Sequence, residues 1–152
     1  MKLWMALYAM VWIALIEFLL VMTPGASSVL IYLHIVIGIV ILGLAFSNFS
    51  GIRMTRVMGR VKRIAQASYN ISVTAGISGV LIFFDIDKTP IIPVINVSIY
   101  GLILFFHVIC AFAIITQAAA IAIAHDMWED KEFEKETEAG VVPPHPMQQK
   151  GE

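Results

Sequence analysis

Charged residues and cysteine are both scarce in this sequence. Only 14% of the 152 residues are charged, and Cys110 is the single cysteine. One cysteine excludes an intramolecular disulfide and leaves the redox compartment open. The formal net charge is −1, so the chain has no excess of positive charge with which to bind nucleic acid. It also lacks a nucleophile motif and a phosphate-binding loop, so the sequence does not decide whether the protein is an enzyme.

Apolar residues dominate the chain. Hydrophobic residues make up 59% of it, and the mean hydropathy is +0.86. Charge gathers in two segments: five of the ten Lys and Arg residues lie within 53–63, and seven of the eleven acids lie within 126–138. Elsewhere run stretches of about 20 apolar residues, the length that crosses a bilayer core of roughly 30 Å. This pattern predicts an integral membrane protein.

The apolar stretches predict an all-α fold, an antiparallel bundle of four transmembrane helices. The first helix is longer than the apolar core of a signal peptide, which has about 7–15 residues. It ends at the breaker Thr23-Pro24-Gly25, and Ser27 or Ser28 provides the N-cap of the second helix. A polar turn from Asp85 to Pro90 follows the third helix. The predicted helices cover about residues 3–22, 28–48, 65–84 and 94–124.

The chain divides into a membrane domain, residues 1–125, and a charged tail, residues 126–152. The first part of the tail, 126–138, is able to continue the fourth helix by a few turns. The loop between the second and third helices carries five basic residues, which the positive-inside rule places in the cytoplasm. Four crossings then put both termini in the cytoplasm, in a multi-pass protein of the cell membrane.

Polar residues inside the membrane are costly and usually functional. Glu17 lies about five residues before the outer end of the first helix, and His34 about six residues after the outer start of the second. At about 1.5 Å per residue, both lie roughly 8–10 Å below the outer surface. His107 is nominally deeper, but its long helix can project outward and bring it to the same level. We therefore expect Glu17, His34 and His107 to form one constellation.

Histidines on the second and fourth helices of such a bundle are diagonal to each other, as needed to hold a haem iron from both sides. Neutral imidazole is a good axial ligand, and a buried neutral histidine costs less than a buried charge. Gly38 and Ala111, one turn after His34 and His107, leave room for the edge of the porphyrin. The residues predict haem b, with His34 and His107 as iron ligands and Gly38 and Ala111 beside the ring.

Two other interpretations stay open for these residues. Membrane histidines also form simple hydrogen bonds between helices, and small residues allow helices to approach without any cofactor. Alternatively, Glu17, His34 and His107 have suitable ligand types for a zinc or copper ion. His125, near the C-terminal end of the fourth helix, interacts favourably with the helix dipole or belongs to a second cofactor site.

Two stretches carry a family resemblance, His34-Ile35-Val36-Ile37-Gly38 and Phe106-His107-Val108-Ile109-Cys110-Ala111. With the basic inner loop and the small-residue third helix, they resemble one four-helix half of the haem A synthase family over about residues 28–125. More loosely, the chain is similar to four-helix haem-b cytochromes. The resemblance implies haem binding by the two histidines. Haem A synthases have a glutamate three residues before the first of these histidines, where this chain has Ile31. Glu17 is the residue able to take its place.

The sequence thus predicts a haem-b protein that transfers electrons within or beside a respiratory complex, with Glu17 orienting an imidazole or accepting a proton. Two alternatives are a cofactor-free accessory subunit of a larger membrane oxidoreductase and a haem-modifying enzyme similar to haem A synthase. The expected partners are the lipid bilayer and either other membrane subunits or further copies of this chain.

Overall fold

The fold consists almost entirely of helix. The computed structural model describes residues 3–21, 27–84, 90–92 and 97–138. Two short strands pair antiparallel before the last helix. In order, the elements are α1 (Leu3–Val21), α2 (Ser28–Met54), α3 (Gly59–Phe83), β1 (Pro90–Ile92), β2 (Val97–Ser98) and α4 (Ile99–Glu138).

Three of the helices, α1, α2 and α4, are long and apolar enough to cross a membrane. Such segments form helices because a helix satisfies every backbone N–H and C=O within itself, as an apolar medium requires. The third helix, α3, is more polar, and it buries Ser68, Ser72 and Ser78 against its neighbours. Two of these hydroxyls donate to carbonyls of the same helix, Ser72 to Ser68 and Ser78 to Ala75, each at 2.9 Å. Ser72 and Ser78 are therefore satisfied within the helix, whereas the buried hydroxyl of Ser68 has no hydrogen-bond partner among the described residues.

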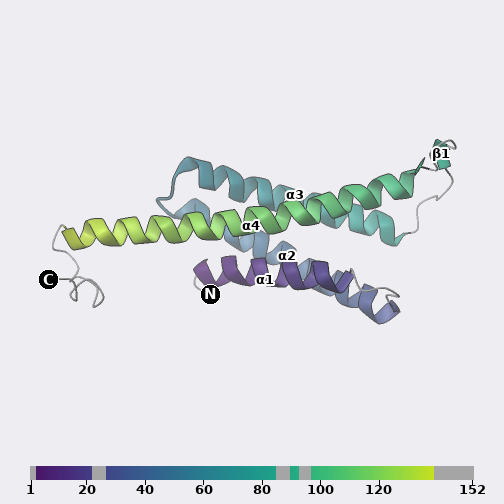
Figure 1. Cartoon of the computed structure of the whole chain (residues 1–152), viewed down its shortest axis with the longest axis horizontal. Coiled ribbons are helices and arrows are strands. Elements are labelled where there is room, and N and C mark those ends of the chain that lie inside the picture. Colours follow the sequence, from purple (N-terminus) through teal and green to yellow (C-terminus); the bar gives the residue numbers. More distant parts are fainter. Residues whose placement is uncertain (1–2, 22–26, 85–89, 93–96, 139–152) are drawn as a thin grey trace.

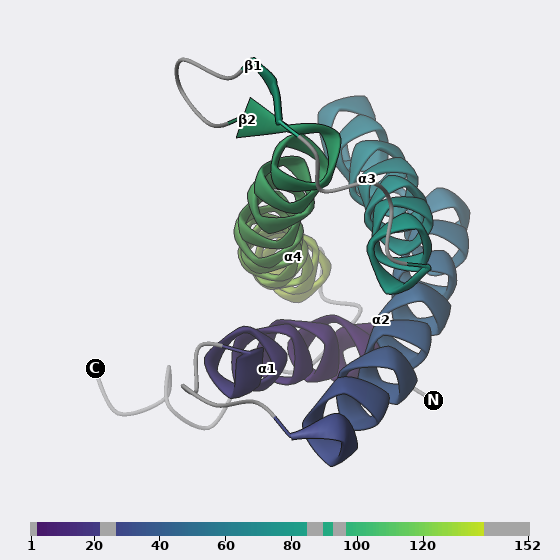
Figure 2. The same ribbon diagram turned by 90° about the vertical axis from the view of Figure 1, so that its right-hand side faces the viewer.

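Each helix packs on two others (Figure 2). Helix α1 contacts α2 and α4, and α3 contacts the same two helices, so α2 and α4 lie on a diagonal. Alanine is frequent at the contacts, where its small side chain lets helices approach closely. One core cluster consists of Met10, Ala14, Ile41, Ala45, Ala75, Cys110, Ile114 and Ala118. A second, nearer the short α2–α3 connection, consists of Leu7, Ile52, Val57, Ala65, Ile121 and Ala122.

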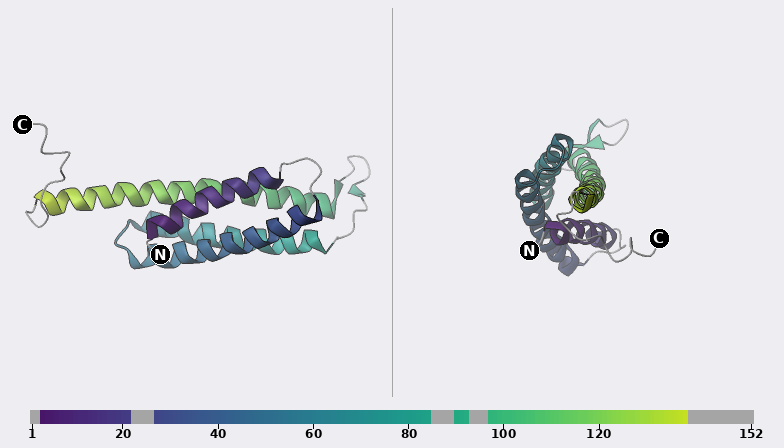
Figure 3. Two further views of the ribbon diagram at one scale, coloured as in Figure 1. Left: turned by 90° about the horizontal axis from the view of Figure 1, so that it is seen from below. Right: turned by 90° about the vertical axis from the view of Figure 1, so that its left-hand side faces the viewer.

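The helices extend further than the hydropathy of the sequence predicts. Helix α2 continues to Met54 and α3 begins at Gly59, so most of the predicted basic loop is helical. Helix α4 has 40 residues, which correspond to about 60 Å, and its C-terminal part projects beyond the other helices (Figures 1 and 3). It begins at Ile99 rather than near 94. Charged residues such as Arg, Lys and Glu favour helix, which explains why these helices continue past their apolar segments.

Some predicted features fall outside the described residues. These include the breaker Thr23-Pro24-Gly25, the turn from Asp85 to Thr89 and the final part of the tail, 139–152. Ser27 occupies the N-cap position of α2 with an extended backbone, and its carbonyl accepts hydrogen bonds from the Leu30 and Ile31 amides at 2.9 and 3.2 Å, but its side chain makes no capping hydrogen bond.

We predict that Ile52→Ala lowers the free energy of unfolding by about 2 kcal/mol. Ile52 is fully buried, so its truncation leaves a cavity, while the cost stays at the low end for core residues because lipid is as apolar as the core. Reversible unfolding in mixed micelles measures the change. The matched control is Ile39→Ala, at a side chain that is 65% exposed on the same helix, and an equal loss there would contradict the prediction.

Candidate functional site

Glu17 and His34 are in direct contact. Glu17 lies near the end of α1 and is buried, while His34 lies in the second turn of α2 and its side chain is 35% exposed. The end of α1 lies beside the start of α2, so the two residues occupy the same level. The Nδ1 atom of His34 meets Oε1 of Glu17. The contact is that of an ion pair, and a neutral imidazole whose Nδ1–H faces a carboxylate keeps its lone pair on Nε2.

His107 is held in a similar way by α3. Its Nδ1 lies 3.0 Å from the carbonyl oxygen of Ala75 and 3.0 Å from Oγ of Ser78. A carbonyl only accepts hydrogen bonds, so Nδ1 carries the proton and donates it, and Nε2 keeps its lone pair. Gly79 allows this position, because a Cβ atom there would lie 3.2 Å from Cε1 of His107. Histidine ligands of metals in proteins typically have their second nitrogen held in this manner.

The two imidazoles lie next to each other across the diagonal of the fold. Their ring centroids are 6.0 Å apart and their planes meet at 71°. All four helices contribute: Glu17 from α1, His34 from α2, Ser78 and the Ala75 carbonyl from α3, and His107 from α4. The structure therefore brings Glu17, His34 and His107 together, as the constellation inferred from the sequence requires. We call His34 and His107 the histidine pair, with Glu17 as its carboxylate.

The two small residues predicted beside the cofactor have different surroundings. Gly38 is exposed, and a Cβ atom at that position would have no neighbour within 4 Å. Ala111 is half-buried on α4. Open space one turn beyond His34 leaves room there for a bulky group, whereas Ala111 belongs to the packed side of its helix.

A mononuclear metal site at the histidine pair is disfavoured. Among the described residues, only His125, Asp126 and Glu129 bring three potential ligand atoms of His, Cys, Asp or Glu within 4.8 Å of one another. Glu17, His34 and His107 do not form such a group, so the zinc or copper interpretation of these residues loses support. His125 itself is buried, 2% exposed, at the end of the fold that contains the α2–α3 connection.

The sequence did not predict the role of Ser78 or the contact between Tyr8 and Asp126. Ser78 was one of many small polar residues on α3, and nothing in its spacing distinguished it from Ser68 or Ser72. The contact of Tyr8 with Asp126 joins residues 118 positions apart and has no local signal.

At the opposite end from the histidine pair, the basic residues line an open cavity of about 470 Å³ formed by Phe49, Arg53, Lys62, Arg63 and Gln66.

Comparison of the chain with protein-family models, curated proteins and solved structures yields no match. The function is therefore argued from the site alone.

We predict that Gly79→Val displaces the His107 ring and destabilises the protein by roughly 1–3 kcal/mol, the usual cost of overpacking. The added methyl groups extend from a Cβ position that already lies 3.2 Å from the imidazole. Thermal unfolding in detergent measures the effect. Gly76→Val is the matched control, because a Cβ atom there has no neighbour within 4 Å. Equal destabilisation of both variants would indicate a general loss of helix propensity instead.

Proposed function

We propose that the chain is a four-helix integral membrane protein, with α3 as the fourth crossing and consecutive helices antiparallel. Two buried serines of α3, Ser72 and Ser78, form hydrogen bonds within their own helix, which lowers the cost of placing that helix in a bilayer. The basic residues around the α2–α3 connection support a cytoplasmic location for that end, and hence for both termini. Their open cavity lies where anionic headgroups of the inner leaflet would meet it.

We further propose that this protein binds haem b through His34 and His107 as the two axial ligands. The observation that carries this proposal is the pair of adjacent imidazoles on diagonal helices, with ring centroids 6.0 Å apart. Two imidazole nitrogens that each lie about 2 Å from one metal ion separate their ring centroids by roughly 6 Å. In both histidines Nδ1 has a partner, and the lone pair on Nε2 is left for the iron.

The donor set and the surroundings fit a haem better than a bare metal ion. Two imidazole donors lie next to each other here, and a haem would need only these two ligands from the protein because its macrocycle supplies the other four. The half-exposed side of His34 and the open space at Gly38 accommodate the edge of the macrocycle. Gly79 keeps the backbone of α3 close to His107, so that helix supports the ring from behind.

Glu17 has a defined role in this proposal. A carboxylate at a ligating histidine fixes the orientation of the imidazole and increases its electron donation. Its negative charge also offsets the positive charge of a ferric haem in an apolar medium, where an isolated carboxylate would be costly. Glu17 is therefore a positioning and charge-compensating residue.

A haem with two protein ligands supplies reversible one-electron chemistry and has no open coordination position. The function that follows is electron transfer, in or beside a respiratory complex, rather than oxygen chemistry. Partner membrane subunits or further copies of the chain would cover apolar side chains that the fold leaves exposed on α2 and α4, such as Val29, Ile39 and Phe105.

A second candidate is a haem-modifying enzyme like haem A synthase. The contact between Glu17 and His34 favours it. In haem A synthases a glutamate lies three residues before this histidine, where the present chain has Ile31. Glu17 on α1 places a carboxylate next to the same histidine. A third candidate is a cofactor-free accessory subunit, in which the same contacts only hold the helices together.

We predict that the detergent-purified protein has a sharp low-spin b-type spectrum in a dithionite-reduced minus oxidised measurement, at about one haem per chain by pyridine haemochrome. His34→Ala and His107→Ala each abolish this spectrum, because each removes one axial ligand. His125→Ala leaves it unchanged. A colourless protein would favour the accessory subunit, and a normal spectrum in either of the first two variants would exclude this ligand pair.

We predict that Glu17→Gln retains the haem but raises its midpoint potential by an amount of the order of tens of millivolts, because the removed charge stabilises the ferric form. Potentiometric titration of the detergent-purified protein measures the shift. Glu129→Gln removes an equal charge at the far end of α4 and serves as control. An unchanged potential in Glu17→Gln would contradict the proposed charge compensation, and loss of haem would show that Glu17 is needed for binding.

A further inference from the structure

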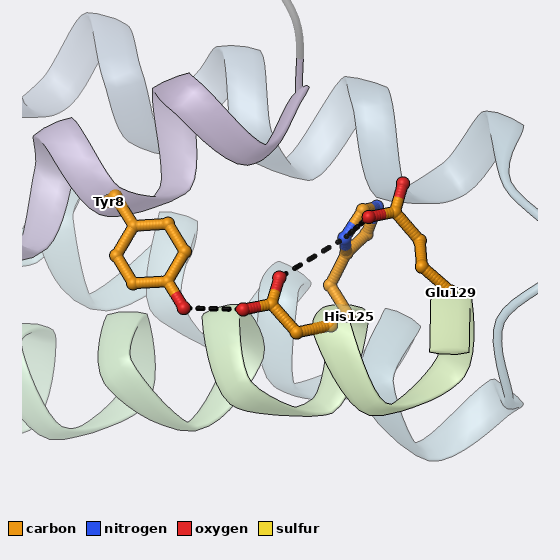
Figure 4. A network of polar contacts seen from close by, with 4 residues as sticks. Tyr8, His125 and Glu129 are labelled. Carbon is orange, nitrogen blue, oxygen red and sulfur yellow. Dashed lines mark hydrogen bonds and ion pairs between the residues drawn. The ribbon is translucent and has the colours of Figure 1, made fainter. Parts of the chain in front are cut away.

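A second polar cluster lies at the inner end of the fold, where α4 passes the start of α1 (Figure 4). His125 is buried, 2% exposed, although Asp126 and Glu129 on the same helix reach solvent. The spacing i, i+1 and i+4 places the three side chains within reach of each other around one turn. Nδ1 of His125 is directed toward both carboxylates, as Figure 4 shows.

The buried nitrogen of His125 lacks a hydrogen-bond partner among the described residues. Its distances to Oδ1 of Asp126 and Oε2 of Glu129 are 3.9 and 3.7 Å, longer than a hydrogen bond. A buried polar atom without a partner is costly, and in native proteins it commonly marks a bound ion or water. The imidazole of His125 packs against the indole of Trp128, with ring centroids 5.9 Å apart. This contact limits the rotation of the imidazole toward other partners.

We propose that His125, Asp126 and Glu129 bind a divalent transition-metal ion. Nδ1 of His125, Oδ1 of Asp126 and Oε2 of Glu129 all lie within 4.8 Å of one another. One imidazole with two carboxylates is a donor set for ions of intermediate softness, such as Zn²⁺ or Mn²⁺. In a tetrahedral site with ligand bonds of about 2.0–2.2 Å, neighbouring donor atoms lie roughly 3.3–3.6 Å apart, so ion binding draws both carboxylates toward Nδ1 from their present 3.9 and 3.7 Å.

Exposure of the carboxylates gives the ion an entry path. The side chains of Asp126 and Glu129 are 41% and 52% exposed, so solvent reaches the cluster from the side opposite the buried histidine. Three protein ligands leave further positions for water. The site is therefore open and exchangeable, unlike a closed structural site with four protein ligands.

Tyr8 supports this site from the neighbouring helix. Its hydroxyl donates a hydrogen bond to Oδ2 of Asp126, the oxygen that does not face His125. One carboxylate thus uses one oxygen for the tyrosine and keeps the other for the ion. Such outer contacts orient ligands, and their loss typically weakens metal affinity about 10–100-fold.

The cluster is independent of the histidine pair. His107 and His125 are 18 residues apart on α4, a separation of about 27 Å along the helix. A metal ion at the inner end also joins α4 to α1 through Asp126 and Tyr8, so binding should stabilise this contact. The inference does not depend on whether the protein binds haem.

The test uses the full-length, tag-free protein in detergent, titrated with Zn²⁺ by calorimetry and with Co²⁺ by visible absorption. We expect one ion per chain at this site and at least tenfold weaker binding in Glu129→Gln. Tyr8→Phe should weaken binding about tenfold or more without removing a ligand. Glu132→Gln is the matched control, because Glu132 has the same charge on the same helical arm and pairs with Lys135 instead. Its affinity should equal that of the unmodified protein.

Three outcomes would overturn the proposal. The first is an equal loss of affinity in Glu129→Gln and Glu132→Gln, which would mean that the ion responds to the acidic arm as a whole. The second is unchanged affinity in Glu129→Gln, which would place the bound ion elsewhere. The third is absence of binding at micromolar metal concentrations, which would leave the cluster as polar contacts within the protein alone. Far-ultraviolet circular dichroism and size-exclusion chromatography of the same samples check that each variant is folded.

Discussion

An acidic side chain buried among apolar helices needs a partner, and the contact between Glu17 and His34 meets that need in this protein. The contact joins the end of α1 to the start of α2 and sets the orientation of the His34 ring. That ring in turn lies beside His107, which α3 holds through a carbonyl and a hydroxyl. The arrangement of all four helices at this level therefore depends on satisfying a few polar atoms.

Helix α3 has a supporting role in this arrangement. Its small residues allow a close approach to α4, and its hydroxyls do not compete for partners because most of them bond within the helix. Ser78 is an exception in part, since its Oγ also lies 3.0 Å from Nδ1 of His107. The lower hydropathy of α3 is thus a consequence of its packing role. A helix that contacts two neighbours with small polar side chains exposes less of that polarity to lipid.

Two histidine environments on α4 differ in the ligands that accompany them. His107 faces another imidazole and has only a hydroxyl and a carbonyl at its other nitrogen, a setting suited to a metal inside a macrocycle. His125 faces two carboxylates that reach water, a setting suited to a hydrated divalent ion. The two histidines of α4 therefore have different surroundings, because the depth in the fold decides which side chains accompany each of them.

The sequence by itself determined the helices and the candidate residues, because long runs of apolar side chains favour helix and the few Glu and His residues within those runs stand out against them. Helix ends were less predictable, since Arg53 and the acidic residues after His125 are polar yet good helix formers. Only the tertiary structure decided which faces meet. Lipid and core are both apolar here, so hydrophobic periodicity carries little information about rotation of each helix. The partnership of Ser78 with His107, and of Tyr8 with Asp126, arises from that rotation.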